Sequence, residues 1–175
     1  VVNTNDNGFI IVGATLSFGP IPDENIYLIK TNEFGDTLWS AAYSCYIEEW
    51  GAAVLQTSDG GYIVLSSIYE FGAGQFDIYI VKTDSNGEVI WAKAYGTPLD
   101  EWTSSIYQTY DGGYLIAGSS RSYVGTTGQH DMYVIRINDD GDTLWSRLYG
   151  RNTDDDFVVN AQQTADSGFV IFGGP

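Results

Sequence analysis

One motif of about fifty residues recurs along the chain, and it constrains the fold more than any other feature of the sequence. A Gln-Thr or Asn-Thr pair marks the same point in each copy, at Asn3-Thr4, Gln56-Thr57, Gln108-Thr109 and Gln163-Thr164, with intervals of 53, 52 and 55 residues. A period of this length is typical of propeller blades and solenoid units, which bury their apolar faces against neighbouring copies. We therefore expect one repeat domain over residues 1-175, with copies at 3-55, 56-107 and 108-162 and a partial copy at 163-175.

Each copy contains four short segments of strand character, and no window has sustained helical periodicity. The second segment is apolar on both faces, which predicts a strand covered on both sides; it recurs at residues 9–12, 62–65, 114–117 and 169–172. An Asp-x-Gly turn precedes it, and glycines at 35, 87 and 141 separate the third segment from the fourth. Glycine supplies the positive φ that a short hairpin needs. The sequence predicts an all-β fold of β-propeller blades, each with four antiparallel strands: about three blades plus an extra strand pair.

The spacing within the copies distinguishes the two ends of the predicted blades. The third segment lies a constant 13 residues before Trp39, Trp91 and Trp145, which we expect to pack between blades. By contrast, the distance from Gly8, Gly61 and Gly113 to the third segment varies as 18, 17 and 19 residues. The distance from each tryptophan to the aromatic residue near the start of the next copy, which is Trp50, Trp102 or Phe157, also varies, as 11, 11 and 12 residues. Both variable connections leave the same end of an up-and-down sheet, which is where we expect a binding surface.

The composition excludes several classes of protein. Acidic residues number 23 and basic residues 7, for a formal charge of −16, which repels phosphate backbones and argues against nucleic acid as a partner. No segment approaches the roughly 20 continuous apolar residues of a membrane-spanning helix. Cys45 is the only cysteine, so no disulfide can form within the chain.

The repeat pattern resembles a known family of proteins. Asp59-Gly60-Gly61-Tyr62, then Asp77-x-Tyr79-x-x-Lys82, then Gly87-x-x-x-Trp91 and Tyr95-Gly96 resemble the repeats of secreted bacterial and archaeal β-propeller proteins. The Gly-x-x-x-Trp hairpin is also loosely similar to the hairpins of quinoprotein propellers and to the Asp-box turn of sialidases, although the Asp-box spacing differs by one residue. The resemblance implies an extracellular or cell-surface scaffold or binding module, and no particular chemistry.

Two acidic residues precede an aromatic residue in each copy, at Glu48-Glu49, Asp100-Glu101 and Asp155-Asp156. Together with Asp77 and Asp131, which lie just before the third segment, they could supply the oxygen ligands that calcium prefers. Calcium is therefore the one candidate cofactor, with Asp77, Asp100, Glu101, Asp131, Asp155 and Asp156 as its candidate ligands. The alternative is that each carboxylate accepts backbone N–H groups and ties adjacent blades together, which recurrence in every copy favours.

Aromatic residues gather in the variable connection between the second and third segments. Ring faces stack on apolar surfaces while carboxylates accept hydrogen bonds, a combination that suits a sugar-binding or peptide-binding surface. The candidate ligand residues are Tyr69, Phe71, Phe76, Tyr123 and His130. The expected partner is a protein or a carbohydrate.

The first functional hypothesis is a non-enzymatic extracellular binding or adhesion scaffold. The second is a structural protein that assembles with copies of itself through its terminal blades into a surface layer or filament. A glycan-processing enzyme is the third, but no nucleophile motif is present and no pair among the many carboxylates stands out. Propellers close with about 4 to 8 blades, so we expect either a part of a longer propeller, a ring completed by other copies, or a module of an open assembly.

Overall fold

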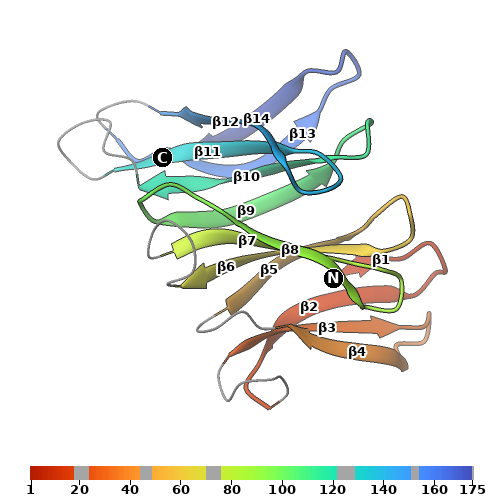
Figure 1. Cartoon of the computed structure of the whole chain (residues 1–175). Helices are drawn as coiled ribbons and strands as arrows, with labels where there is room; N and C mark the ends of the chain where they lie inside the picture. The colour runs from red at the N-terminus through yellow and green to blue at the C-terminus, as the bar shows by residue number, and fades with distance from the viewer. Residues whose placement is uncertain (18–23, 44–48, 70–75, 122–128, 151–153, 175) are drawn as a thin grey trace.

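The chain folds into stacked β-sheets. The computed structural model describes residues 1–17, 24–43, 49–69, 76–121, 129–150 and 154–174, and over these residues all regular structure is β-strand. Three sheets have four strands and one has two, and neighbouring strands in each sheet are antiparallel (Figure 1). No helix that could cross a membrane occurs in the described residues. The predicted all-β fold of three propeller blades and an extra strand pair is confirmed.

The strands follow the repeat. Blade 1 comprises β1 (Val2–Asn3), β2 (Phe9–Thr15), β3 (Asn25–Thr31) and β4 (Thr37–Tyr43). Blade 2 comprises β5 (Glu49–Gln56), β6 (Tyr62–Tyr69), β7 (Phe76–Thr83) and β8 (Val89–Tyr95). Blade 3 comprises β9 (Glu101–Gln108), β10 (Tyr114–Arg121), β11 (His130–Ile137) and β12 (Thr143–Tyr149). The half-blade comprises β13 (Phe157–Gln163) and β14 (Phe169–Gly174).

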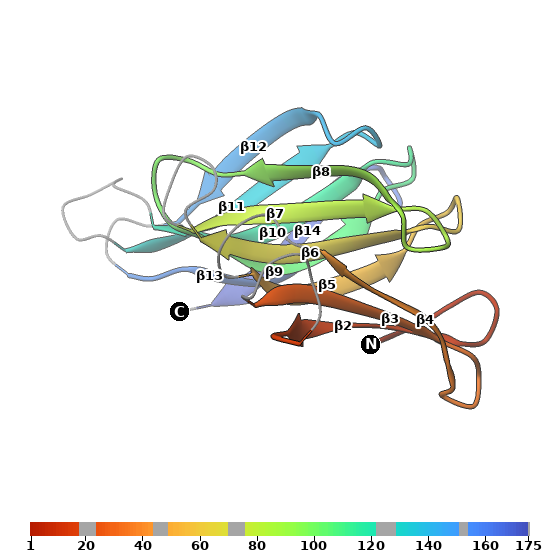
Figure 2. The same ribbon diagram turned by 60° about the horizontal axis from the view of Figure 1, so that its bottom comes forward.

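The blades pack face to face, and the core lies between them (Figure 2). Alternate residues of the second strand serve opposite junctions: Val64 is buried against blade 1, whereas Ile63 and Leu65 are buried against blade 3. The predicted apolar strand covered on both faces is therefore present. The first strand β9 contacts both β5 and β13, which places the first strands innermost in the stack.

A second set of contacts joins the blades at their outer edge. Tyr43 and Tyr95, each at the end of a fourth strand, donate hydrogen bonds of 2.8 and 2.7 Å to the carbonyl oxygens of Gly87 and Gly141 in the following blade. The Trp91 Nε1 donates to the Asp139 carbonyl at 3.0 Å. The recurrent tryptophans and tyrosines are thus part of the blade junctions.

Bulges recur at two repeat positions, one in the first strands β5, β9 and β13 and one in the fourth strands β4, β8 and β12. In the first strand, the register against the second strand shifts at Ala52, Ser104 and Val159. In the fourth strand it shifts at Leu38, Ile90 and Leu144, three apolar residues that are consequently more than half exposed. A bulge adds one residue to a strand. Side chains beyond the bulge therefore point to the opposite face of the sheet from the one that strict alternation predicts.

The two ends of the blades differ in construction, as the spacing predicts. At one end, hereafter the turn end, every connection is a tight turn closed by a backbone hydrogen bond, such as Thr57 to Gly61 or Asp84 to Glu88. The opposite end, hereafter the loop end, carries the starts of β5, β7, β9, β11 and β13 (Figure 1).

Candidate functional site

Five aromatic rings form a continuous row across the loop end. We call this set the aromatic row: Tyr69, Phe76, Trp102, His130 and Phe157. Successive ring centroids lie 4.9, 6.1, 4.8 and 5.0 Å apart. The contacts are edge-to-face, tilted or stacked, which are the favourable geometries for aromatic pairs.

The row is assembled from three successive sheets. Tyr69 is the last residue of β6 and pairs with Phe76, the first residue of β7. Trp102 is the second residue of β9, and His130 and Phe157 are the first residues of β11 and β13. First strands are innermost, so Trp102 and Phe157 bring the row close to the centre of the stack. The described row becomes more open toward Phe157, which is 41% exposed.

Two carboxylates hold the row in place by linking adjacent blades. Asp100 Oδ1 accepts a hydrogen bond of 3.4 Å from the backbone N–H of Phe76. Asp155 Oδ1 accepts one of 2.8 Å from the backbone N–H of His130 and lies 3.1 Å from His130 Nδ1. These hydrogen bonds, the backbone one first, lower the pKa of Asp155, so this carboxylate is ionised at neutral pH. The two acidic residues therefore do what the structural alternative to calcium predicts.

A second pair of carboxylates lies beneath the row. Asp77 and Glu101 belong to blades 2 and 3, and both are fully buried. A Cβ added to Gly96 would overlap Asp77 Oδ1 and Glu101 Oε2, so the two groups approach each other at this glycine. Burial raises the pKa of Glu101, and the charge of Asp77 raises it further.

The surroundings of Glu101 suit a hydrogen-bonded carboxyl better than a calcium ligand. Its Oε1 accepts hydrogen bonds of 2.6 and 2.7 Å from the Thr97 and Ser120 hydroxyls, and its Oε2 accepts one of 2.9 Å from the Thr97 N–H. Calcium needs 6 to 8 oxygen ligands, whereas these donors already occupy both carboxyl oxygens. Over the described stretches, no group of three or more His, Cys, Asp or Glu side chains is gathered as a metal site would require.

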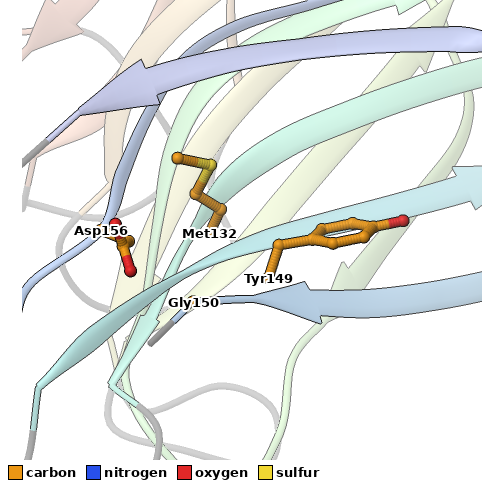
Figure 3. Close-up of a pocket in the computed structure, with 4 residues that line it drawn as sticks. All are labelled: Met132, Tyr149, Gly150 and Asp156. Atoms are coloured by element: carbon orange, nitrogen blue, oxygen red, sulfur yellow. The ribbon is translucent and has the colours of Figure 1, made fainter. Parts of the chain in front are cut away.

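The corresponding residues at the next junction line an open pocket. Met132, Tyr149, Gly150 and Asp156 surround about 220 Å³ of space (Figure 3). They occupy the repeat positions of Ile78, Tyr95, Gly96 and Glu101, of which Ile78, Tyr95 and Glu101 are buried at the junction of blades 2 and 3. The described half-blade contributes only β13 and β14. The pocket therefore lies where, at the junction of blades 2 and 3, the third strand of the following blade packs. Asp131, buried at the position of Asp77, lies against Gly150 at this junction.

The structure brings together three of the five predicted ligand residues, Tyr69, Phe76 and His130. Phe71 and Tyr123 lie outside the described residues, as does Glu48, and nothing is described of the Glu49 side chain. Trp102 and Phe157 were not among the sequence-based candidates. The available signal was their shared position directly after an acidic pair, at the start of the innermost strand.

No protein-family model and no curated protein sequence matches the chain. Solved structures share its fold. A protein of unknown function from Bacteroides caccae superposes with a TM-score of 0.53 at 15% identity, over 91% of this chain and 51% of that one. A mannose phosphorylase from Leishmania mexicana, solved with phosphate, has a TM-score of 0.56 at 12% identity, over 98% and 61% of the two chains. A hypothetical protein from Leishmania major has a TM-score of 0.55 at 14% identity, over 98% and 60%.

This chain spans between about half and three fifths of the length of those proteins. At such low identity the likeness concerns the fold, and function must be argued from the surface of this chain.

Proposed function

We propose that the chain is a non-enzymatic, extracellular binding module of propeller type, and that the aromatic row at the loop end contacts its ligand. The observation that carries this proposal is the row itself, five rings in continuous contact across three sheets. Aromatic side chains give large contact areas at low entropic cost, and a rigid row preorganises them. The extracellular location rests on the family resemblance of the repeat.

The turn end offers a poorer candidate because its polar groups serve the repeat. Asp6, Asp59 and Asp111 each pair with a buried basic residue of the third strand, Lys30, Lys82 and Arg136 respectively. The glutamines of the first strands accept backbone N–H groups of the preceding blade, such as Ser58 N–H to Gln108 Oε1 at 3.0 Å. These contacts recur from blade to blade and account for the uniform spacing.

An activity like that of the mannose phosphorylase receives less support from the charges at the loop end. A phosphorylase must bind phosphate, which cationic side chains favour. Arg121, the basic residue described nearest the row, has its Nη1 3.5 Å from Asp100 Oδ2. The surrounding carboxylates repel an anion, so we propose binding without catalysis.

The test is an array of immobilised glycans and peptides probed with the intact chain. The double variant Trp102→Ala and Phe157→Ala should lose binding by about ten-fold or more, because each ring is worth roughly 1 kcal/mol or more at an interface. Phe34→Ala is the matched control, since Phe34 is 82% exposed at the turn end. Equal binding by the row variant and the wild type would refute the proposed ligand face.

The second candidate function is self-assembly through the half-blade. Val170 and Phe172 of β14 are 48% and 53% exposed, whereas Ile63 and Leu65 at the same repeat positions are fully buried by the next blade. Exposed apolar sheet faces of this kind favour association. Sedimentation equilibrium should show concentration-dependent mass that Phe172→Asp abolishes and Ile90→Asp, at an exposed bulge, does not. A wild-type monomer at all concentrations would eliminate this candidate.

A further inference from the structure

We infer that the aromatic row takes a cationic ligand, namely lysine or arginine side chains in a basic segment of a protein partner. The inference rests on the binding function proposed above and specifies its ligand. It follows from how this chain distributes its own charges and from how it holds its own cations.

Carboxylates dominate the described charges around the row. Asp154 and Asp155 are exposed at its open end, where Asp156 follows them, and Asp100 lies at its middle. Arg121 is the one basic side chain among the described residues beside them, and it is paired with Asp100. A surface of one sign draws ligands of the opposite sign and raises their rate of association.

The turn end is acidic too, but there the repeat provides its own cations. Lys30, Lys82 and Arg136 are buried against the turn aspartates, as described above. Lys93 pairs with Asp142 at 2.8 Å. The repeat therefore compensates part of the acidic charge at the turn end, whereas the described carboxylates at the loop end, Asp100 and Asp154 to Asp156, outnumber Arg121, the described basic side chain paired there.

One internal contact shows how such a partner side chain would be held. Lys93 Nζ lies 5.9 Å from the centre of the Trp91 ring while it pairs with the carboxylate of Asp142. An aromatic face and a carboxylate together stabilise an ammonium or guanidinium group more than either does alone. The aromatic row repeats this combination without a lysine of its own: Asp155 stands beside the rings of His130 and Phe157, and Asp100 precedes Trp102.

Anionic and neutral ligands fit these groups less well. Among the described residues, sulfate or phosphate groups would face these carboxylates and the guanidinium of Arg121, which is already paired with Asp100. A neutral sugar needs donors as well as acceptors, whereas ionised carboxylates only accept. A guanidinium, with five N–H donors and a planar face that stacks on rings, uses both features of this surface.

The experiment is calorimetric titration of the intact chain with the peptide acetyl-(Arg-Gly)4-amide and with its counterpart in which citrulline replaces each arginine. Citrulline keeps the shape and most donors of arginine but is neutral. We expect the arginine peptide to bind at least ~10-fold more tightly than the citrulline peptide, and to weaken as sodium chloride rises from about 50 to 300 mM. The affinity for the arginine peptide should fall ~10-fold in the double variant Trp102→Ala and Phe157→Ala, and ~5-fold in Asp155→Asn.

Matched variants at the turn end separate a site from general attraction to an acidic protein. Phe34→Ala and Asp140→Asn remove an exposed ring and an exposed carboxylate there, and both should bind like the wild type. Equal losses in the row and turn-end variants, or none in either, would overturn the inference. Binding of neutral glycans or citrulline peptides that depends on Trp102, with no preference for arginine, would overturn the cationic ligand while leaving the proposed binding function intact. Circular dichroism and melting of each variant verify that it is folded.

Discussion

Asp77 and Glu101, fully buried carboxylic acids from adjacent blades, meet at the backbone of Gly96. Two carboxylates that share a buried site cannot both ionise without cost. Blade 1 has Asn25 at the repeat position of Asp77, and Asn25 is also fully buried. An amide has the shape of a protonated carboxyl but no charge, so blade 1 carries a neutral side chain at this repeat position.

Asp77→Asn should stabilise the protein, and more so as the pH rises. Burial and then the charge of Asp77 raise the pKa of Glu101 above its ordinary 4.5 in the folded state. The folded state therefore binds more protons than the unfolded state in that window, and stability falls as the pH rises through it. Removing the Asp77 charge should make this fall in stability shallower, and the part that comes from burial of Glu101 should remain. Urea unfolding at several pH values measures both effects.

The reverse substitution in blade 1 is the matched control. Asn25→Asp should introduce a pH dependence of the same sign, with stability lower at pH 8 than at pH 5, because burial raises the pKa of the introduced carboxyl. If Asp77→Asn instead destabilised the protein equally at every pH, the two carboxyls would not be competing for a proton.

Tyr95→Phe should cost about 1 kcal/mol, because the Gly141 carbonyl loses the hydrogen bond that joins blades 2 and 3. Tyr149 holds the same repeat position but is 45% exposed, since β13 and β14 place no hairpin glycine against it. Tyr149→Phe should therefore change the free energy of unfolding by less than about 0.3 kcal/mol. Comparable losses in the two variants would contradict the assigned role of the tyrosine.

Lys82→Met should destabilise the protein by about 1–2 kcal/mol, because the buried Lys82 Nζ lies 3.1 Å from Asp59 and 2.6 Å from Asp139 in the next blade. Lys93→Met, which removes a more exposed pair, should cost less than about 0.5 kcal/mol. Chemical denaturation at neutral pH compares the two.

The same variant should respond differently to acid. Partial burial acts to raise the pKa of Asp59, but hydrogen bonds from Thr57, Gly61 and Lys82 outweigh it and hold that pKa below its ordinary 3.8. The stability from this contact is present above pH 3.8 and is lost as the pH falls through the lowered value. In Lys82→Met the free energy of unfolding should fall less steeply as the pH is lowered. If it fell as steeply as in the wild type, Lys82 would not stabilise the ionised aspartate.

Calcium at millimolar concentration should leave the melting temperature unchanged relative to the same concentration of magnesium. Both carboxyl oxygens of Glu101 accept hydrogen bonds from Thr97 or Ser120, and calcium would have to displace those donors. A calcium-specific rise in the melting temperature that Glu101→Gln removes would restore the calcium hypothesis.

Much of the fold can be predicted from the sequence because the same apolar segments and turn residues recur in each copy of the repeat. The apolar run at residues 62–65 predicts a strand covered on both faces, and Ile63 and Val64 pack against opposite neighbours. The bulges were not predictable in this way. Ser104 interrupts the alternation of β9, which begins at Glu101, so residues on the two sides of the bulge do not follow a single period-two pattern.

The same bulge explains why part of the aromatic row escaped the sequence-based prediction. Trp102 lies before the bulge, where the spacing in the sequence varies between copies, although it belongs to the innermost strand. Tyr69, Phe76 and His130 were predicted because they stand next to a connection of variable length. Their contact with Trp102 and Phe157 depends on how neighbouring blades stack, which spacing within one blade does not determine.

The central claim is that ligands bind at the loop end, and hydrogen–deuterium exchange tests it most directly. Amide exchange would be measured with and without a saturating ligand from the array or the arginine peptide. We expect slower exchange at residues 100–102, 129–131 and 154–157, around the aromatic row. Protection confined to the tight turns at 32–36, 84–88 and 138–142, or to β14, would contradict it.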